Sequence, residues 1–296
     1  MARAAIDIGS NSLLLTILDD DGTVLDDRAE VVGLGTGLGD HGMFLPDRMA
    51  AAEEVLTAYV SAAQAHGIQP WNVRAVATSG ARRAMNAETW FARIARKLQL
   101  RVKIISGEEE ARLAWLGAIG NMNLPAAPCL VVDLGGGSTE LVLGQGHTVY
   151  SRSSLELGSV RLTEAMLTDP VDPEAVQLAR SHVDIELTKI PLAHPPALVI
   201  GLAGTVTTLA AMAAGLTDWN AALIQGTALG LDQLSTFVDQ LRVATPAQRA
   251  LLAAVAPKRA PFLLAGAIIL ERVLIHARAP EMLVSDRGLR YGLLAR

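Results

Sequence analysis

Short apolar runs alternate with acidic, glycine-containing turns at two corresponding places in the chain. The runs 4–6 and 130–132 each precede such a turn, and the runs 13–15 and 141–143 follow it. This order predicts a strand, a tight turn and a second strand, so each region is expected to form a β-hairpin. One hairpin therefore stands at the start of each half of the chain.

Helix and strand signals alternate behind each hairpin. Helical spacing predicts a helix over about 46–66, and β-rich runs predict strands at 73–77 and 101–105. Ser106 and Glu109 have the spacing of a helix capping box. The second half is expected to contain strands within 129–150, a helix over about 172–189 and a strand at 197–200. This repeated plan predicts a duplicated α/β fold with a cleft between its halves, where ligands meet the carboxyl ends of strands.

The proline-containing segment 121–128 marks the expected domain boundary. We expect an N-terminal domain over 1–123 and a C-terminal domain over 124–284. The final segment, from about 285 to 296, is placed so that it can pack back on the N-terminal domain.

The uncharged stretch 196–216 is long enough to span a bilayer. It divides into a β-rich run, a Gly/Thr turn and an alanine-rich helix, and it lacks a flanking positive cluster or aromatic belt. We therefore expect no membrane span here. The apolar segment 261–270 fits either a core helix or a homodimer interface, and a core helix is the default.

Composition excludes several classes of protein. Apolar residues make up 51% and charged residues 19% of the 296, which predicts a substantial core rather than disorder. The net charge of −5 argues against a nucleic-acid-coating protein, and any anionic substrate must be held by local groups. The single Cys129 excludes an internal disulfide and fits a reducing compartment. No signal peptide pattern is visible, since Asp7 interrupts the early apolar run, so a cytoplasmic location is expected.

The two hairpin turns carry groups suited to phosphate and metal. Their glycines let backbone amides approach an anion, and serine and threonine hydroxyls add donors. Asp7, Asp133 and Glu140 offer the hard oxygen ligands that Mg²⁺ prefers. Facing each other, two such turns would form a phosphate–metal clamp.

A third loop, 201–208, leaves a strand and enters a helix, so its amides form a candidate anion site. Arg82 follows a polar turn and can present a planar fork to phosphate. Lys258, Arg259 and Arg287 are weaker candidates for the same role.

The run Glu108–Glu110 begins a predicted helix, where acidic side chains favour the helix dipole. Glu110 projects about 100° away from Glu109, so it is free to serve another purpose, such as taking a proton from water. The six histidines show no zinc-ligand spacing. A serine-hydrolase elbow and a P-loop are both absent from the sequence.

Six motifs, in order along nearly the whole chain, resemble the exopolyphosphatase / guanosine pentaphosphate phosphohydrolase (Ppx/GppA) family. They are Asp7-Ile-Gly-Ser-Asn-Ser12, Ala77-Thr-Ser-x-x-Arg82, Ile105-Ser-Gly-Glu-Glu-Glu-Ala-Arg112, Val132-Asp-Leu-Gly-Gly-Gly-Ser-Thr-Glu140, Gly204-Thr205 and Ser285-Asp-Arg-Gly-Leu-Arg290. The resemblance implies two ribonuclease-H-like, actin-like domains flanking a central cleft. It also implies Mg²⁺-dependent release of terminal phosphate from a phosphoanhydride chain.

The same resemblance assigns roles to individual residues. Glu110 is similar to the family's catalytic base, and Asp133 and Glu140 to its metal-binding and water-positioning acids, joined by Asp7. The implied phosphate contacts are Ser10, Asn11, Arg82, Gly135, Gly136, Gly137, Ser138, Gly204 and Thr205. Water would attack the terminal phosphorus in line, with Glu110 orienting or deprotonating it.

The expected substrate is inorganic polyphosphate. Short chains are favoured by the net acidity and by the absence of the helical C-terminal region found in long relatives. Guanosine pentaphosphate is the alternative substrate within the family. From other classes, a non-hydrolysing sensor of polyphosphate or nucleotide and a kinase or ATPase of the same superfamily stay open as hypotheses.

The chain departs from the family pattern at Leu14, Gln225 and Tyr291, where many relatives carry arginine, histidine and glutamate. Gly33 also replaces a basic residue. These changes remove potential phosphate contacts, so they are expected to affect substrate affinity more than chemistry.

Overall fold

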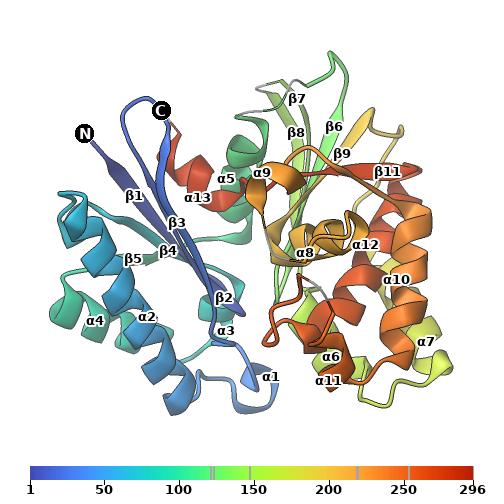
Figure 1. The fold of residues 1–296 in the computed structure, drawn as a ribbon, viewed down its shortest axis with the longest axis horizontal. Helices are drawn as coiled ribbons and strands as arrows, with labels where there is room; N and C mark the ends of the chain where they lie inside the picture. Colours follow the sequence, from blue (N-terminus) through green and yellow to red (C-terminus); the bar gives the residue numbers. More distant parts are fainter. Residues whose placement is uncertain (121, 123, 147, 218–219, 253, 296) are drawn as a thin grey trace. The chain divides into compact units, whose positions relative to one another are not determined.

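The computed structural model describes residues 1–120, 122, 124–146, 148–217, 220–252 and 254–295. The chain divides into two compact units (Figure 1). Unit 1 comprises Met1–Gly120 and Leu289–Arg296, and unit 2 comprises Asn121–Gly288. The returning segment thus begins at Leu289 rather than near 285. Ser285 stays in unit 2 because its amide donates a hydrogen bond to Gly201 O at 2.9 Å.

Unit 1 contains a five-stranded mixed sheet in the order β3-β2-β1-β4-β5. Its strands are β1 (Arg3–Ile8), β2 (Ser12–Leu18), β3 (Val24–Val31), β4 (Arg74–Ala77) and β5 (Val102–Ile104). The first three strands pair antiparallel, whereas β4 and β5 run parallel to β1. The predicted hairpin and the strands at 73–77 and 101–105 are therefore confirmed.

Helices cover both faces of this sheet. They are α1 (Leu38–His41), α2 (Pro46–Ala65), α3 (Ser79–Arg83), α4 (Ala87–Leu98), α5 (Gly107–Ile119) and α13 (Leu289–Leu294), with a 3-10 turn η1 (Pro70–Asn72). Ile6, Ile8 and Leu13 point to the face that packs with Leu56 and Tyr59 of α2. The opposite face receives α5 and α13, which lie side by side although they are far apart in sequence (Figure 1).

Unit 2 contains a six-stranded sheet in the order β10-β11-β9-β6-β7-β8. Its strands are β6 (Cys129–Leu134), β7 (Thr139–Gln145), β8 (Thr148–Leu155), β9 (Leu198–Leu202), β10 (Ala228–Gly230) and β11 (Glu281–Val284). The pairs β6–β7 and β7–β8 are antiparallel and β6–β9 is parallel, which repeats the arrangement at the start of unit 1.

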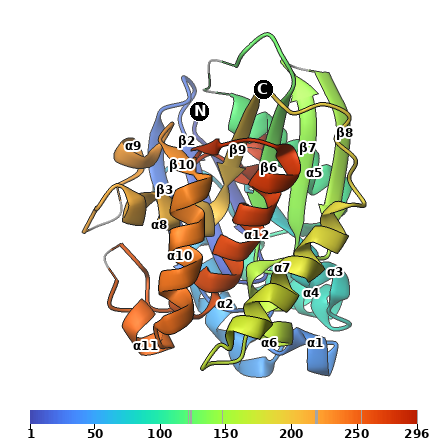
Figure 2. The same cartoon turned by 90° about the vertical axis from the view of Figure 1, so that its right-hand side faces the viewer.

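The helices of unit 2 lie mainly against one face of its sheet (Figure 2). They are α6 (Ser159–Met166), α7 (Pro173–Leu187), α8 (Ala203–Ala213), α9 (Ala221–Ile224), α10 (Leu231–Val243), α11 (Pro246–Arg249) and α12 (Leu263–Ala277), with the 3-10 turn η2 (Ala260–Phe262). The stretch 196–216 becomes β9 and α8, as predicted. The strand passes directly into the helix, without the intervening turn that the glycines and threonines suggested.

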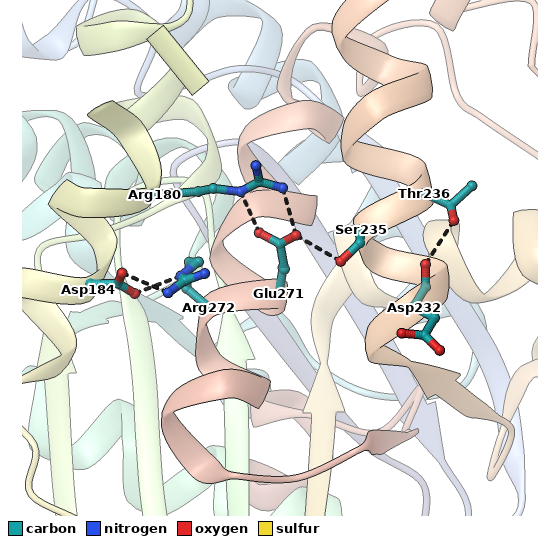
Figure 3. A network of polar contacts seen from close by, with 7 residues as sticks. All are labelled: Arg180, Asp184, Asp232, Ser235, Thr236, Glu271 and Arg272. Atoms are coloured by element: carbon teal, nitrogen blue, oxygen red, sulfur yellow. Dashed lines mark hydrogen bonds and ion pairs between the residues drawn. The ribbon is translucent and has the colours of Figure 1, made fainter. Parts of the chain in front are cut away.

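One stretch, Ala260–Ala277, is long and apolar enough to cross a membrane by length and composition. Within the fold, 72% of it is buried, which fits the core helix of unit 2. Its Glu271 is buried too, and Arg180 of α7 and Ser235 of α10 donate hydrogen bonds to that carboxylate (Figure 3). The segment 261–270 therefore lies in the core, its default assignment.

Candidate functional site

The hairpin turn of unit 1 is closed by a backbone hydrogen bond, and two glycines, Gly35 and Gly80, lie against its Ser10. The amide of Gly9 donates to Ser12 O at 3.0 Å, and Asp7 lies near the end of β1. The amide of Gly35 donates to Ser10 O at 2.6 Å. A methyl group at Gly80, in α3, would lie 2.9 Å from Ser10 Oγ. The turn therefore rests against α3, which brings the polar start of that helix to Ser10.

Two polar atoms at this turn are buried without a hydrogen-bond partner among the described residues. They are Asn11 Oδ1 and Ser79 Oγ, and Ser79 is only 2% exposed. Leaving such atoms unpaired costs free energy, so they favour a polar ligand here. Asn11 was a predicted phosphate contact. Ser79 is not among the predicted phosphate contacts, although its position in the polar turn before Arg82 could have indicated that role.

Arg82 and Glu110 form an ion pair in unit 1. Arg82 Nη1 donates to Glu110 Oε2 at 2.6 Å and to Ile105 O at 3.1 Å. Glu110 lies in the first turns of α5 and is 7% exposed. A guanidinium carries five N–H donors, so Arg82 can orient this carboxylate and still offer donors to an anion.

Glu109 has a different partner from Glu110. Ser106 Oγ accepts from the amide of Glu109 at 3.2 Å, as the capping-box spacing predicts. The carboxylate of Glu109 forms a two-bond ion pair with Arg112, at 2.8 Å for each bond. Bidentate pairing raises the pKa of the Arg112 guanidinium. Adjacent glutamates thus face different surroundings, as their 100° separation on the helix predicts.

The hairpin turn of unit 2 repeats that of unit 1. The amide of Gly135 donates to Ser138 O at 2.9 Å, which matches the bond from Gly9 to Ser12. The carbonyls of Gly135 and Gly136 accept amides from the start of α6. A methyl group at Gly158 would lie 2.4 Å from the carbonyl carbon of Gly136, so only glycine permits this approach. With these carbonyls held by α6, the turn is fixed in shape before any ligand binds.

Two acidic side chains of unit 2 are direct neighbours across strands. Asp133 of β6 pairs with Glu140 of β7, and Glu140 pairs with Ser154 of β8. Residues paired in this way point to the same face of the sheet, about 5 Å apart at Cβ. Ser154 Oγ donates to Glu140 Oε1 at 2.8 Å. Like charges placed opposite each other repel, and a cation beside both carboxylates would offset that repulsion.

The junction between β9 and α8 forms the third candidate element. Ala203 adopts a φ of 75°, in the left-handed region that few residues other than glycine occupy. Among the residues that the structure describes, no side chain caps the start of α8, whose first-turn amides lack intrahelical acceptors. Thr205 is buried, and its methyl group packs closely on Gly266. A methyl group added at Gly266 would lie 2.2 Å from the methyl carbon of Thr205. The methyl group of Thr205 therefore packs inside unit 2, against Gly266 of α12.

Arg259 lies against this helix end. Its Nη1 donates to Gly204 O at 3.0 Å and to Thr208 Oγ1 at 2.8 Å. A methyl group at Gly204 would lie 2.4 Å from Arg259 Nη2, so a larger residue here would displace the guanidinium. Burial lowers the pKa of the Arg259 guanidinium. A partly buried cation beside the positive end of a helix favours an anionic ligand, which makes Arg259 a stronger candidate than its sequence context alone suggested.

The structure gives the neighbours of the three residues, Leu14, Gln225 and Tyr291, that depart from the family pattern. Leu14 lies opposite Asp7 in the β1–β2 register. Gln225 Oε1 accepts the amide of Asp286 at 2.8 Å. The Tyr291 hydroxyl donates to Asp27 Oδ2 at 2.9 Å. Gln225 and Tyr291 therefore make contacts within their own units.

Each unit gathers its own share of the predicted residues. Unit 1 holds Asp7, Ser10, Asn11, Arg82 and Glu110, and unit 2 holds the rest. Within the part of the chain that the structure describes, no three histidine, cysteine, aspartate or glutamate side chains form a metal-binding group.

Comparisons with known proteins agree with this arrangement. The Ppx/GppA phosphatase family matches residues 18–296. The chain is similar to exopolyphosphatase 2 of Mycobacterium tuberculosis, with 38% identity over 91% of this chain and 89% of that protein. Among solved structures, an Aquifex aeolicus member of the Ppx/GppA family has a TM-score of 0.83 and 34% identity, covering 99% of this chain and 96% of that one. An exopolyphosphatase-like protein has a TM-score of 0.93 and 31% identity, covering 99% and 98%. With its two α/β units and an Asp-x-Gly hairpin turn in each, the chain belongs to the Ppx/GppA phosphatase family.

Proposed function

We propose that this protein is an exopolyphosphatase, which hydrolyses the terminal phosphoanhydride of inorganic polyphosphate and releases orthophosphate. The observation that carries the proposal is the buried Glu110 carboxylate held by Arg82. A binding protein needs anion donors only, whereas hydrolysis also needs a group that accepts a proton from water. The 38% sequence identity with exopolyphosphatase 2 also supports polyphosphate as the substrate class.

The carboxylates fit Mg²⁺. This ion keeps several waters and is usually held by one or two carboxylates together with substrate phosphates, rather than by a full set of protein ligands. The cross-strand pair Asp133 and Glu140 supplies two such carboxylates in unit 2, and Asp7 is the further candidate in unit 1. When bound, Mg²⁺ would neutralise charge on phosphate oxygens.

Glu110 is proposed as the base that orients and deprotonates the attacking water. Its ion pair with Arg82 fixes the carboxylate in one orientation, and the N-cap at Ser106 fixes the start of its helix. Arg82 would also contact a phosphate oxygen, because the N–H donors of its planar guanidinium group suit phosphate oxygens.

The remaining donors are proposed to hold phosphate oxygens. Ser10 and Asn11 serve in unit 1, and Gly136, Gly137 and Ser138 serve in unit 2, where the predicted contact Gly135 instead closes the turn by donating its amide to Ser138 O. Gly204 and Thr205 add helix N-terminal amides, and Arg259 adds a cation beside them. Preorganised amides of this kind stabilise charge that develops during phosphoryl transfer.

The test is phosphate release from short and long polyphosphate, with guanosine pentaphosphate and ATP in parallel, with Mg²⁺ and after its removal by EDTA. Glu110→Gln should lower turnover by about 10²–10⁴-fold, the usual contribution of a general base. Glu108→Gln is the matched control, because Glu108 lies two residues away and is exposed. It should leave turnover unchanged.

Undiminished turnover in Glu110→Gln would remove Glu110 from the role of base. Release from guanosine pentaphosphate alone would move the substrate to that nucleotide. Tight binding of polyphosphate with no release in the presence of Mg²⁺ would overturn the proposal in favour of a sensor, and phosphorylation of an acceptor by ATP would favour a kinase.

A further inference from the structure

We propose that the C-terminal helix α13 positions the Glu110 carboxylate by holding α5, with Gly292 as the positioning residue. This inference rests on the proposed role of Glu110. It concerns unit 1 alone, to which both helices belong.

Gly292 forms the contact between the two helices. A methyl group added at Gly292 would lie 1.9 Å from Leu113 O and 2.7 Å from the carbonyl carbon of Leu113. Both distances are far inside van der Waals contact, so the backbones can approach this closely only with glycine here. Leu113 lies three residues after Glu110 on α5, which is about one helical turn. The contact therefore bears on the turn of α5 that follows the carboxylate.

Side chains of α13 fasten it to two strands of the sheet. Arg290 Nη1 donates to Leu15 O of β2 at 2.9 Å and also bonds Asp27 of β3. The Tyr291 hydroxyl donates to the second oxygen of the Asp27 carboxylate. Arg290 is only 9% exposed, so its ion pair is poorly screened by water.

Two further strands hold the end of α13. Arg3 of β1 donates to Leu294 O, and Arg74 of β4 donates to Leu293 O. Cationic side chains are favourable at the carbonyl end of a helix. Four neighbouring strands, β3, β2, β1 and β4, thus bind this six-residue helix.

Apolar contacts join α13 to the sheet and to α5. Tyr291 and Leu294 pack with Ala5 and Leu18, whereas Leu289 packs with Leu113. Because α13 is bonded to the strands, crowding between the two helices would be relieved by movement of α5. Such a shift would change the position of Glu110 relative to Arg82, to which it is bonded at 2.6 Å.

The experiment compares Gly292→Ala with the wild type in Mg²⁺-dependent phosphate release. We expect kcat to fall by about 10–100-fold, since a displacement of 1 Å can cost that much. KM should change by less than about 3-fold, because the proposed phosphate contacts, Arg82 of α3 included, lie outside α5. Gly39→Ala is the matched control, because Gly39 is exposed and a methyl group there meets no described atom within 4 Å.

A double-mutant cycle separates positioning from general damage. Gly292→Ala in the Glu110→Gln background should cause no further loss of the residual rate, because its effect passes through the missing base. A similar loss in both backgrounds would overturn the inference. So would wild-type kcat in a folded Gly292→Ala protein.

Tyr291→Phe is the second variant, in case Gly292→Ala does not fold. It removes one hydrogen bond of α13 and keeps the ring. It should lower kcat by about 2–5-fold, again only when Glu110 is present, since a single neutral hydrogen bond has a modest effect. An equal loss with Glu110→Gln would contradict the proposal. Absence of phosphate release by the wild type would instead refute the proposed function, so the two failures are distinct.

Discussion

The ion pair between Arg82 and Glu110 shows what a single residue's neighbours in space add to its neighbours in sequence. Glu110 stands in a run of three glutamates, which by itself fits a solvated helix start. The helical angle indicated that Glu110 departs from its neighbours, and its burial agrees with that. Its partner Arg82 lies 28 residues earlier and follows β4, whereas Glu110 follows β5. No local spacing could have paired them.

Cys129 makes the stability of the protein depend on pH. It is fully buried, its thiol faces Ala127 O at 3.5 Å, and burial raises the pKa of the thiol. A raised pKa means that the folded state keeps the proton more tightly than the unfolded state. The resulting stability is complete below the unfolded pKa of about 8.5 and is lost as pH rises through the folded pKa.

We therefore expect the unfolding free energy to fall more steeply between pH 8 and pH 10 in the wild type than in Cys129→Ala. Urea titrations across this range measure both slopes, and the difference between them isolates the thiol from other titrating groups. Equal slopes would contradict the prediction. Thiol reagents should also react with the native protein far more slowly than with the denatured chain.

At the scale of elements, α12 illustrates a charge placed inside an apolar helix. The sequence marks 261–270 as apolar, and Glu271 follows immediately. The structure shows that α12 stays in the core past this residue, because Arg180 pairs with its carboxylate (Figure 3). This pairing raises the pKa of the Arg180 guanidinium. The network joins α7, α10 and α12.

Breaking this pair from one side should destabilise unit 2. Glu271→Gln is expected to lower the unfolding free energy by about 2–3 kcal/mol, since a buried charged group loses its partner. The double variant Arg180→Met, Glu271→Leu should recover much of that loss, because apolar side chains replace both charges. Chemical denaturation measures each value.

The neighbouring pair of Arg272 and Asp184 provides the control. Asp184 is 43% exposed at its side chain, so Arg272→Met should cost no more than about 1 kcal/mol. A larger loss for Arg272→Met than for Glu271→Gln would show that burial does not decide the value of these ion pairs.

At the scale of the whole molecule, the chain leaves unit 1 at Gly120 and returns to it at Leu289. The last residues thus complete a unit whose other parts come from the first 120. Tyr291 and Leu294 fill the space beside Ala5 and Leu18, on the sheet face opposite α2. Unit 1 is therefore expected to depend on both ends of the chain.

Ending the chain at Gly288 should weaken unit 1 and spare unit 2. Hydrogen exchange should rise by at least about 10-fold in β1, β2 and α5, since their cover and hydrogen bonds to α13 are removed. Amides of α12 and β9 should keep their protection, which makes unit 2 the internal control. Unchanged exchange in β1 and β2 would show that α13 is dispensable for unit 1.

The amino-acid sequence was sufficient to predict the two hairpins, the strands and helices that follow them, and the family. These follow from local physics, since apolar alternation, glycine turns and the Ser106 cap act over a few residues. Short motifs also place Asp7, Asp133 and Glu110 near strand ends and helix starts. Packing of distant segments, in contrast, brings Arg82 to Glu110, Arg259 to Gly204 and Gly292 to Leu113. Such contacts depend on sheet register and on how closely backbones approach, and both are settled by packing of segments that are remote in the chain.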